Sequence, residues 1–101
     1  MPDNPLSTAM KIDPKVVEHM KANDEWVFSD GALSRKVKLL IALAFDAAHG
    51  AVGGVNGLAQ RAMKEGATAD EIAEVLRVAY LMTGVGAIYI GSQGLRDLFP
   101  R

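Results

Sequence analysis

The spacing of apolar residues constrains this chain of 101 residues more than any other feature of its sequence. After Ser34, a favourable residue at a helix N-cap, apolar side chains recur at helical spacing as far as His49. The members of this stripe are Val37, Leu40, Ile41, Ala44, Phe45 and Ala48. Gly50 suits the left-handed residue that ends many helices. No window alternates apolar and polar residues as a half-buried strand would, so the sequence predicts an all-α fold.

Capping signals place the other helices. Asp13-Pro14 predicts a helix start, with the aspartate as N-cap and the proline in the first turn. A short helix is expected over about 55–65, after a glycine-rich bend, and a last helix over about 86–99. Thr68 and Glu71 have the spacing of a capping box. This spacing predicts that another helix, between the 55–65 and 86–99 helices, begins at Thr68.

These helices are expected to form a single domain over residues 13–101. Residues 1–12 contain two prolines and show little periodicity, which predicts an extended N-terminal arm. In the bend region, the glycine pairs 50/54 and 53/57 are each four positions apart. This spacing favours a close approach of helix backbones, because glycine has no side chain to separate them.

Charge and cysteine content exclude several classes of protein. The formal net charge of −1 and the scattered basic residues argue against a nucleic-acid binder or a protein of acidic membrane surfaces. The chain has no cysteine, so its stability must come from packing or assembly and not from disulfides. Because the N-terminus lacks the pattern of a signal peptide, we expect a cytoplasmic location.

A run of eighteen residues without a formal charge, 78–95, approaches the ~20 residues that a membrane-spanning helix needs. Gly84 and Gly86 interrupt this run, and each interior glycine costs roughly 1 kcal/mol relative to alanine. We therefore interpret the run as two packed helices and not as a membrane span. Its apolar surface exceeds the need of a small monomer, which predicts a homo-oligomer with this run in the subunit contacts.

Four segments resemble the carboxymuconolactone decarboxylase family, which includes the alkylhydroperoxidase-D-like proteins. The similar segments are 38–44 (KLLIALA), Gly50, 62–68 (AMKEGAT) and 71–76 (EIAEVL). The resemblance extends over residues 34–89. It implies the family's helical bundle with a two-helix core, and homo-oligomers that are often trimers or hexamers.

The peroxidase branch of this family carries Cys-x-x-Cys-x-x-x-His directly after the glycine. In this chain Ala51 and Gly54 stand at the two cysteine positions, and Leu58 stands at the histidine. Leu39 occupies the place of an acidic residue twelve positions earlier, and Gly53 replaces a further histidine of the family. Thiol redox chemistry needs a thiolate and a resolving partner. The sequence therefore predicts that thiol peroxidase activity is absent.

His49 is the candidate catalytic residue, because the resemblance places it beside the bend that carries the family's active site. Asp46 lies three residues earlier, so both side chains fall on nearly the same face of the helix. A carboxylate there would orient the imidazole and raise its pKa, giving an acid–base pair that works near neutral pH. The alternative is a structural histidine that interacts favourably with the negative end of the helix dipole.

Three further residues are candidates for binding a substrate. Asn56 and Gln60 are four positions apart on one predicted helix and would orient a ligand from the same face; alternatively they form a solvated or intersubunit polar stripe. Tyr80 would line a cavity, although an aromatic residue at helical spacing is often a core residue. The basic cluster 35–38 would bind an anion or serve only as a solvated helix end.

No cofactor or metal site is predicted, since no group of His, Asp or Glu has the spacing of metal ligands. Three functions remain open. The chain could be a cofactor-free lyase or isomerase acting on a small carboxylated lactone, as the resemblance to the decarboxylase branch implies. It could instead bind a small molecule without catalysis, or serve as a structural homo-oligomer.

Overall fold

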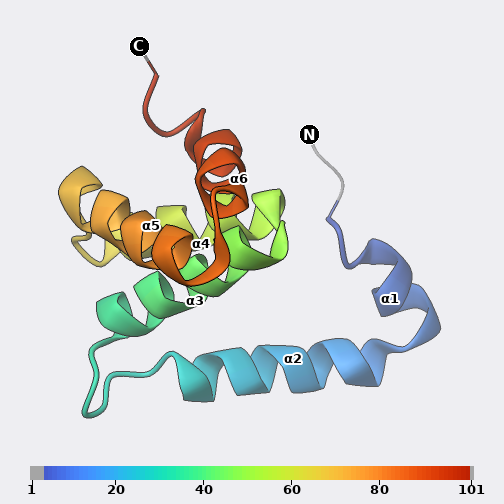
Figure 1. Cartoon of the computed structure of the whole chain (residues 1–101). Helices are drawn as coiled ribbons and strands as arrows, with labels where there is room; N and C mark the ends of the chain where they lie inside the picture. Colours follow the sequence, from blue (N-terminus) through green and yellow to red (C-terminus); the bar gives the residue numbers. More distant parts are fainter. Residues whose placement is uncertain (1–3, 101) are drawn as a thin grey trace.

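The computed structural model describes residues 4–100, which form helices and no strand. The helices are α1 (Ser7–Ile12), α2 (Pro14–Val27), α3 (Arg35–His49), α4 (Val52–Lys64), α5 (Ala69–Thr83) and α6 (Gly86–Leu95). Figure 1 shows two parts: α3 to α6 pack into a compact bundle, and α1 and α2 form an arm beside it. The predicted all-α fold is confirmed.

Helix α3 lies at the centre of the bundle, but the side chains that it buries are Leu39, Leu40, Leu43 and Ala47. Of the predicted apolar stripe only Leu40 is buried, and Val37, Ile41 and Phe45 are 37–61% exposed, so the stripe lies mainly on the outer face of α3. Helix α3 contacts α4, α5 and α6, and α6 also contacts α4 and α5. Four large side chains are almost entirely removed from solvent, at 0–1% exposure: Leu39, Leu43, Val55 and Ile72. Each such burial is worth about 1.5–3 kcal/mol in transfer free energy. The bundle is thus held together by apolar contacts between all four of its helices.

The predicted helix ends of the bundle are confirmed by their caps. The Ser34 hydroxyl accepts a hydrogen bond from the Val37 N–H at 3.2 Å. Gly50 ends α3 with a φ of 82°, in the left-handed region that glycine adopts without steric cost. Thr68 and Glu71 form both hydrogen bonds of a capping box at the start of α5, at 2.9 and 3.1 Å.

Three boundaries differ from the prediction. Residues 1–3 lie outside the described residues, but 7–12 are helical and not extended, because an Asn4 turn starts α1: its side chain accepts from the Leu6 N–H at 2.9 Å. Helix α4 begins at Val52, three residues before the predicted start. Gly53 and Gly54 lie in its first turn, and Gly57 lies in its second. Helix α6 ends at Leu95, and turns continue to Phe99.

The glycines that allow close packing are Gly54 of α4, beside Asp46, and Gly91 and Gly94 of α6; the prediction was wrong for the pair 53/57. A side chain at Gly94 would come within 2.7 Å of the Val55 side chain and 2.9 Å of the Val52 carbonyl oxygen. At Gly53 and Gly57 a side chain would meet nothing within 4 Å. Glycine is therefore required where α6 crosses α4, and not on the outer side of α4.

The arm has almost no core of its own. Neither α1 nor α2 has a buried residue. The radius of gyration of 14.3 Å exceeds the roughly 12.7 Å expected for a compact domain of this length, as a projecting arm would produce. Within residues 4–100, no helix combines the length and the apolar character that a bilayer crossing requires, so the run 78–95 is divided between α5 and α6.

Candidate functional site

The bend between α3 and α4 has no side chain capable of thiol or acid–base chemistry. Gly50, Ala51, Val52, Gly53 and Gly54 follow each other there, and α4 has no side-chain cap at its start. The Ala51 N–H donates to the Asp46 carbonyl oxygen at 2.9 Å, which satisfies a carbonyl group at the end of α3. Any chemistry at this bend must therefore come from the neighbouring residues His49 and Asp46.

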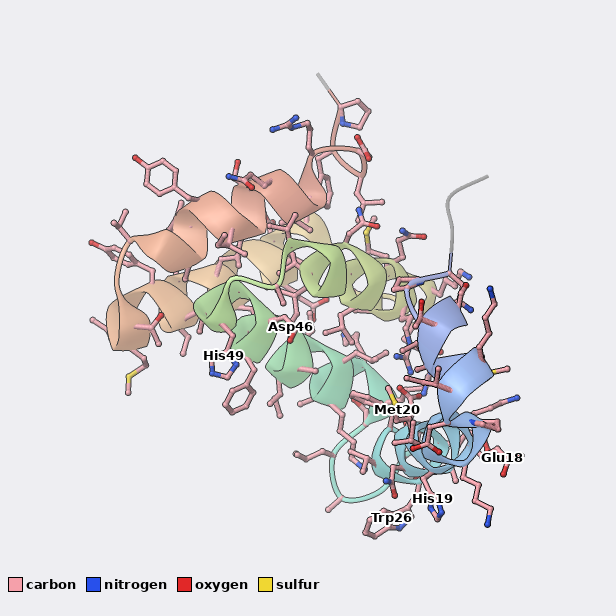
Figure 2. All side chains as sticks on the ribbon, turned by 90° about the vertical axis from the view of Figure 1, so that its right-hand side faces the viewer. Glu18, His19, Met20, Trp26, Asp46 and His49 are labelled. Atoms are coloured by element: carbon pink, nitrogen blue, oxygen red, sulfur yellow. The ribbon has the colours of Figure 1, made fainter. Side chains whose placement is uncertain are left out.

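Asp46 and His49 do not form a pair in this structure. No hydrogen bond joins their side chains within residues 4–100, and Figure 2 shows Asp46 turned towards α4 while His49 points away from the end of α3. The Asp46 carboxylate occupies the space beside Gly54, where a side chain would collide with it. His49 is exposed and lies beside Phe45, with 6.2 Å between the ring centroids. The carboxylate therefore supports helix packing and does not orient the imidazole.

Asn56 joins α4 to α6, and Gln60 contacts Asn56 from within α4. The Asn56 amide donates to the Gly94 carbonyl oxygen of α6 at 2.9 Å, and the Gln60 amide donates to the Asn56 side-chain oxygen at 2.7 Å. This chain of hydrogen bonds joins α4 to α6 at the crossing that Gly94 makes possible. Tyr80 lies on α5 with 48% of its surface exposed. The five predicted site residues thus lie at separate places and do not surround one cavity.

Several hollows border the outer face of α3, and two of them include Phe45, the neighbour of His49. The first, between α3 and α5, has a volume of about 300 Å³ and is lined by Ile41, Ala44, Phe45, Ala48, Val78, Ala79, Met82 and Thr83. Its one hydroxyl group, on Thr83, already donates to the Ala79 carbonyl oxygen at 2.7 Å. We call this hollow the α3–α5 groove. It offers apolar contacts and no free polar side chain, so it cannot fix a charged ligand.

The second hollow, which we call the α2–α3 cleft, has a volume of about 510 Å³ between the arm and the bundle. It is lined by Trp26, Val27, Phe28, Ser29, Lys38, Ile41, Ala42 and Phe45. A further hollow of about 770 Å³ beside the end of α6 contains none of the predicted site residues. The α2–α3 cleft was missed in the sequence because its walls come from two helices that share no motif.

The basic cluster at the start of α3 is divided by its partners. Arg35 forms an ion pair with Glu65 at 3.3 Å, and Lys36 forms one with Glu71 at 2.9 Å. Lys38 donates to the Ser29 carbonyl oxygen at 2.7 Å and has no carboxylate within 4.0 Å in residues 4–100. Lys38 is therefore the cation of this cluster whose charge is not balanced, and it lines the cleft.

The ion pair with Lys36 affects the titration of Glu71. The hydrogen bond from Lys36, followed by the one from the Thr68 backbone N–H, lowers the pKa of the Glu71 carboxyl below its ordinary value of 4.5. This glutamate caps α5 and is not part of either hollow. Within residues 4–100, no three side chains of His, Asp or Glu lie together as metal ligands would.

Comparison with known proteins agrees with this fold. Residues 14–89 match the profile of the carboxymuconolactone decarboxylase family, so the chain belongs to that family. A crystal structure of a family protein from Legionella pneumophila, determined in the apo form, superposes with a TM-score of 0.81 at 29% identity. The match covers 89% of this chain and 80% of the Legionella protein. No curated protein is significantly similar to this chain in sequence.

Proposed function

We propose that this member of the carboxymuconolactone decarboxylase family is a homo-oligomer that has lost thiol chemistry and binds a small molecule without transforming it. One observation carries the proposal. The polar residues around the bend already have partners within the chain: Asp46 lies against Gly54, the Asn56 amide donates to the Gly94 carbonyl oxygen of α6, and Gln60 donates to Asn56 within α4. An active site needs polar groups that are free to contact the substrate, and this bend supplies none besides His49.

The exposed surface supports the homo-oligomer. The chain exposes 7241 Å², whereas a compact monomer of 10.8 kDa exposes about 5,500 Å². The projecting arm contributes to this excess of about 1,700 Å², which is roughly twice the ~800 Å² that one partner contributes to an interface of standard size. The residues of α5 and α6 that expose large apolar side chains include Val78, Leu81, Met82, Val85 and Tyr89, at 57–80% exposure. A second copy on this face would cover them.

Light scattering on a matched pair of variants tests the assembly. Leu81, 80% exposed on α5, lies on the proposed contact face, whereas Ile12 lies on the arm with 79% exposure. We expect Leu81→Glu to reduce the mass at micromolar concentration to that of a smaller species, since a buried carboxylate is costly. Ile12→Glu should leave the mass unchanged. A wild-type protein of monomeric mass would overturn the proposal.

The enzymatic alternative remains a second candidate because of one observation: His49 is exposed at the bend, next to Phe45 and thus to the α3–α5 groove. In this alternative, the protein is a cofactor-free lyase or isomerase for a small carboxylated lactone. His49 acts as the general acid–base, Asp46 turns towards it when substrate binds, and Asn56, Gln60 and Tyr80 contact the substrate.

Turnover assays distinguish the two candidates. Wild type, His49→Ala and His19→Ala are compared with a carboxylated muconolactone and, separately, with an organic hydroperoxide and a dithiol. His19 is the matched control, as it is exposed on the arm. The binding function predicts no turnover by any of the three. Lactone turnover that falls about 10²–10⁴-fold in His49→Ala only would establish the enzyme instead. Peroxide turnover would contradict the loss of thiol chemistry.

A further inference from the structure

We infer that the α2–α3 cleft is the ligand site and that it takes a small aromatic carboxylate, with Lys38 contacting the carboxylate and Trp26 and Phe45 contacting the ring. The inference rests on the proposed binding function and adds to it the place and the chemical class of the ligand. It does not involve His49, which lies eleven residues after Lys38 on α3, roughly 16 Å along the helix.

The walls of the cleft fit an aromatic ligand. Trp26 is 76% exposed and Phe45 is 61% exposed, so both offer ring surface that is open to a ligand in the described part of the chain. Ile41 and Val27, which also line the cleft, are each close to half exposed. A volume of about 510 Å³ falls within the roughly 300–1,000 Å³ of small-molecule sites. Offset stacking on either ring would stabilise a bound aromatic group.

The charge of the ligand follows from the state of Lys38. Its ammonium group has three donors, and the Ser29 carbonyl oxygen accepts one of them. The neighbouring cations Arg35 and Lys36 already have glutamate partners, so an incoming carboxylate would pair with Lys38. The Ser29 hydroxyl already donates its proton to the Trp26 carbonyl oxygen at 2.7 Å. The ligand's carboxylate would therefore bind Lys38 and not this hydroxyl.

The length of the ligand follows from the helix. Lys38 and Phe45 are seven residues apart on α3, which places them about 10 Å apart along the same face. A ring joined to a carboxylate by a short chain spans that distance. The opposite wall is preformed, because Arg61 of α4 holds the arm: its guanidinium binds the Asp24 carboxylate at 2.6 and 3.1 Å and lies 4.9 Å above the Phe28 ring. A preformed site loses little entropy on binding.

The test uses the one tryptophan of the chain, which lines the cleft. Phenylbutyrate is the probe, and phenylbutyramide, which has the same ring and chain but no charge, is the matched control ligand. We expect phenylbutyrate to change the emission of Trp26 in a saturable manner. We expect the amide to bind about 3- to 10-fold more weakly, as is usual for the loss of a charged hydrogen bond at a half-exposed site. Calorimetry measures both affinities independently of fluorescence.

Two lysine variants locate the carboxylate. Lys38→Met keeps an apolar chain of similar length and removes the charge, so its affinity for phenylbutyrate should fall to that of the amide. Lys36→Met removes a neighbouring charge that is paired with Glu71, and it should bind phenylbutyrate within about twofold of wild type. Equal affinity for the acid and the amide in wild type would overturn the inference. So would an unchanged affinity in Lys38→Met.

Failure of this inference can be distinguished from failure of the proposed function. If calorimetry detects phenylbutyrate binding while the Trp26 emission stays constant, the ligand binds elsewhere and only the α2–α3 cleft is wrong. If Trp26 emission responds to protein concentration and not to the probe, a second copy occupies the cleft and the inference is overturned, although the homo-oligomer stands. A monomeric mass by light scattering refutes the homo-oligomer. The phenylbutyrate measurements then still show whether the α2–α3 cleft is the ligand site.

Discussion

The bundle and the arm are both helical, yet different forces hold them in place. Helices α3 to α6 bury apolar side chains such as Leu39 and Leu43 completely, whereas no residue of α1 or α2 is buried. The arm is attached by polar contacts and by one apolar side chain: Arg61 binds Asp24, Arg35 and Lys38 donate to the carbonyl oxygens of Phe28 and Ser29, and the Phe28 ring at the end of α2 packs against the core. Figure 1 shows the result, a compact bundle with two helices standing beside it.

This difference assigns different tasks to the two parts. Apolar burial gives the bundle most of its stability, because the net value of a surface ion pair is only about 0–1 kcal/mol. Such pairs fix an orientation at little cost, and here they hold Phe28 and Trp26 opposite α3. The bundle therefore accounts for folding, and the arm accounts for the shape of the cleft.

The comparison is tested most strongly by truncating one apolar side chain in each part. Leu43 in α3 is 0% exposed, and Met20 in α2 is 47% exposed. We expect Leu43→Ala to lower the free energy of unfolding by about 2–5 kcal/mol, because it removes buried contacts and leaves a cavity. Met20→Ala should change it by less than about 0.5 kcal/mol. Chemical denaturation at one fixed protein concentration measures both, since assembly contributes to apparent stability.

A large loss of unfolding free energy in Met20→Ala would contradict the difference between the arm and the bundle. Such a result would mean that the arm is buried in the assembled protein, with Met20 packed against a second copy. Light scattering on the same variant would then show a change in mass. A small loss of unfolding free energy in Leu43→Ala would contradict the assignment of the core, since few side chains in the bundle are as well buried.

A smaller effect is expected where the arm meets the bundle. Arg61→Met removes the bidentate ion pair with Asp24 and the stacking of the guanidinium on Phe28. The side chains in this pair are 33% and 41% exposed, so solvent screens it, and we expect a loss of about 1 kcal/mol or less. Because the loss is local, amide exchange in α2 should become about fivefold faster while α3 keeps its protection.

Arg77→Met is the control for this measurement. Arg77 is exposed on α5 and forms no ion pair within residues 4–100. Its removal should leave exchange in α2 unchanged. If Arg61→Met also left α2 unchanged, the arm would be held by contacts other than this pair. If it accelerated exchange in α3 equally, the arm and the bundle would unfold as one unit.

The bundle could be predicted from the sequence because its signals are local and agree with each other. Ser34, Gly50 and the Thr68–Glu71 box mark helix ends through hydrogen bonds to residues close in the chain. The apolar stripe of α3 predicted a helix correctly but not the core, since Leu40 is its one buried member and Leu39 and Leu43 lie outside it. Prediction was wrong for the start of α4, where packing against α3 extends the helix through two glycines that disfavour it locally. It was also wrong for residues 7–12, which were expected to be extended but form α1 after the Asn4 turn.

The candidate site could be predicted only in part. Helical spacing correctly placed Asp46 and His49 within one turn, but it could not show that Gly54 leaves room for the carboxylate on the other side. Asn56 and Gln60 are close to each other as predicted, yet their partner is a backbone carbonyl of α6, which no local pattern indicates. The ability of the cleft to bind an anion depends on which cation of the basic cluster remains without a carboxylate partner. That outcome is decided by glutamates 30 or more residues away.

The smallest effect that sharpens the comparison concerns an ion pair of the bundle, between Lys36 and Glu71. The pKa of Glu71 is lowered by Lys36 and by the capping hydrogen bond, so ionised Glu71 favours the folded state. This contribution is fully present above the ordinary value of 4.5 and is lost as the pH falls through the lowered pKa.

Glu71→Gln preserves the capping geometry and removes the charge. We expect it to be slightly less stable than wild type near neutrality, and the difference should shrink steadily in acid. Glu74→Gln, an exposed residue of the same helix without an ion pair in residues 4–100, should show little difference at any pH. Denaturation curves for the three proteins across the acid range measure this. A difference that persists in acid would show that the effect does not come from the charge of Glu71, and that glutamine does not preserve the cap.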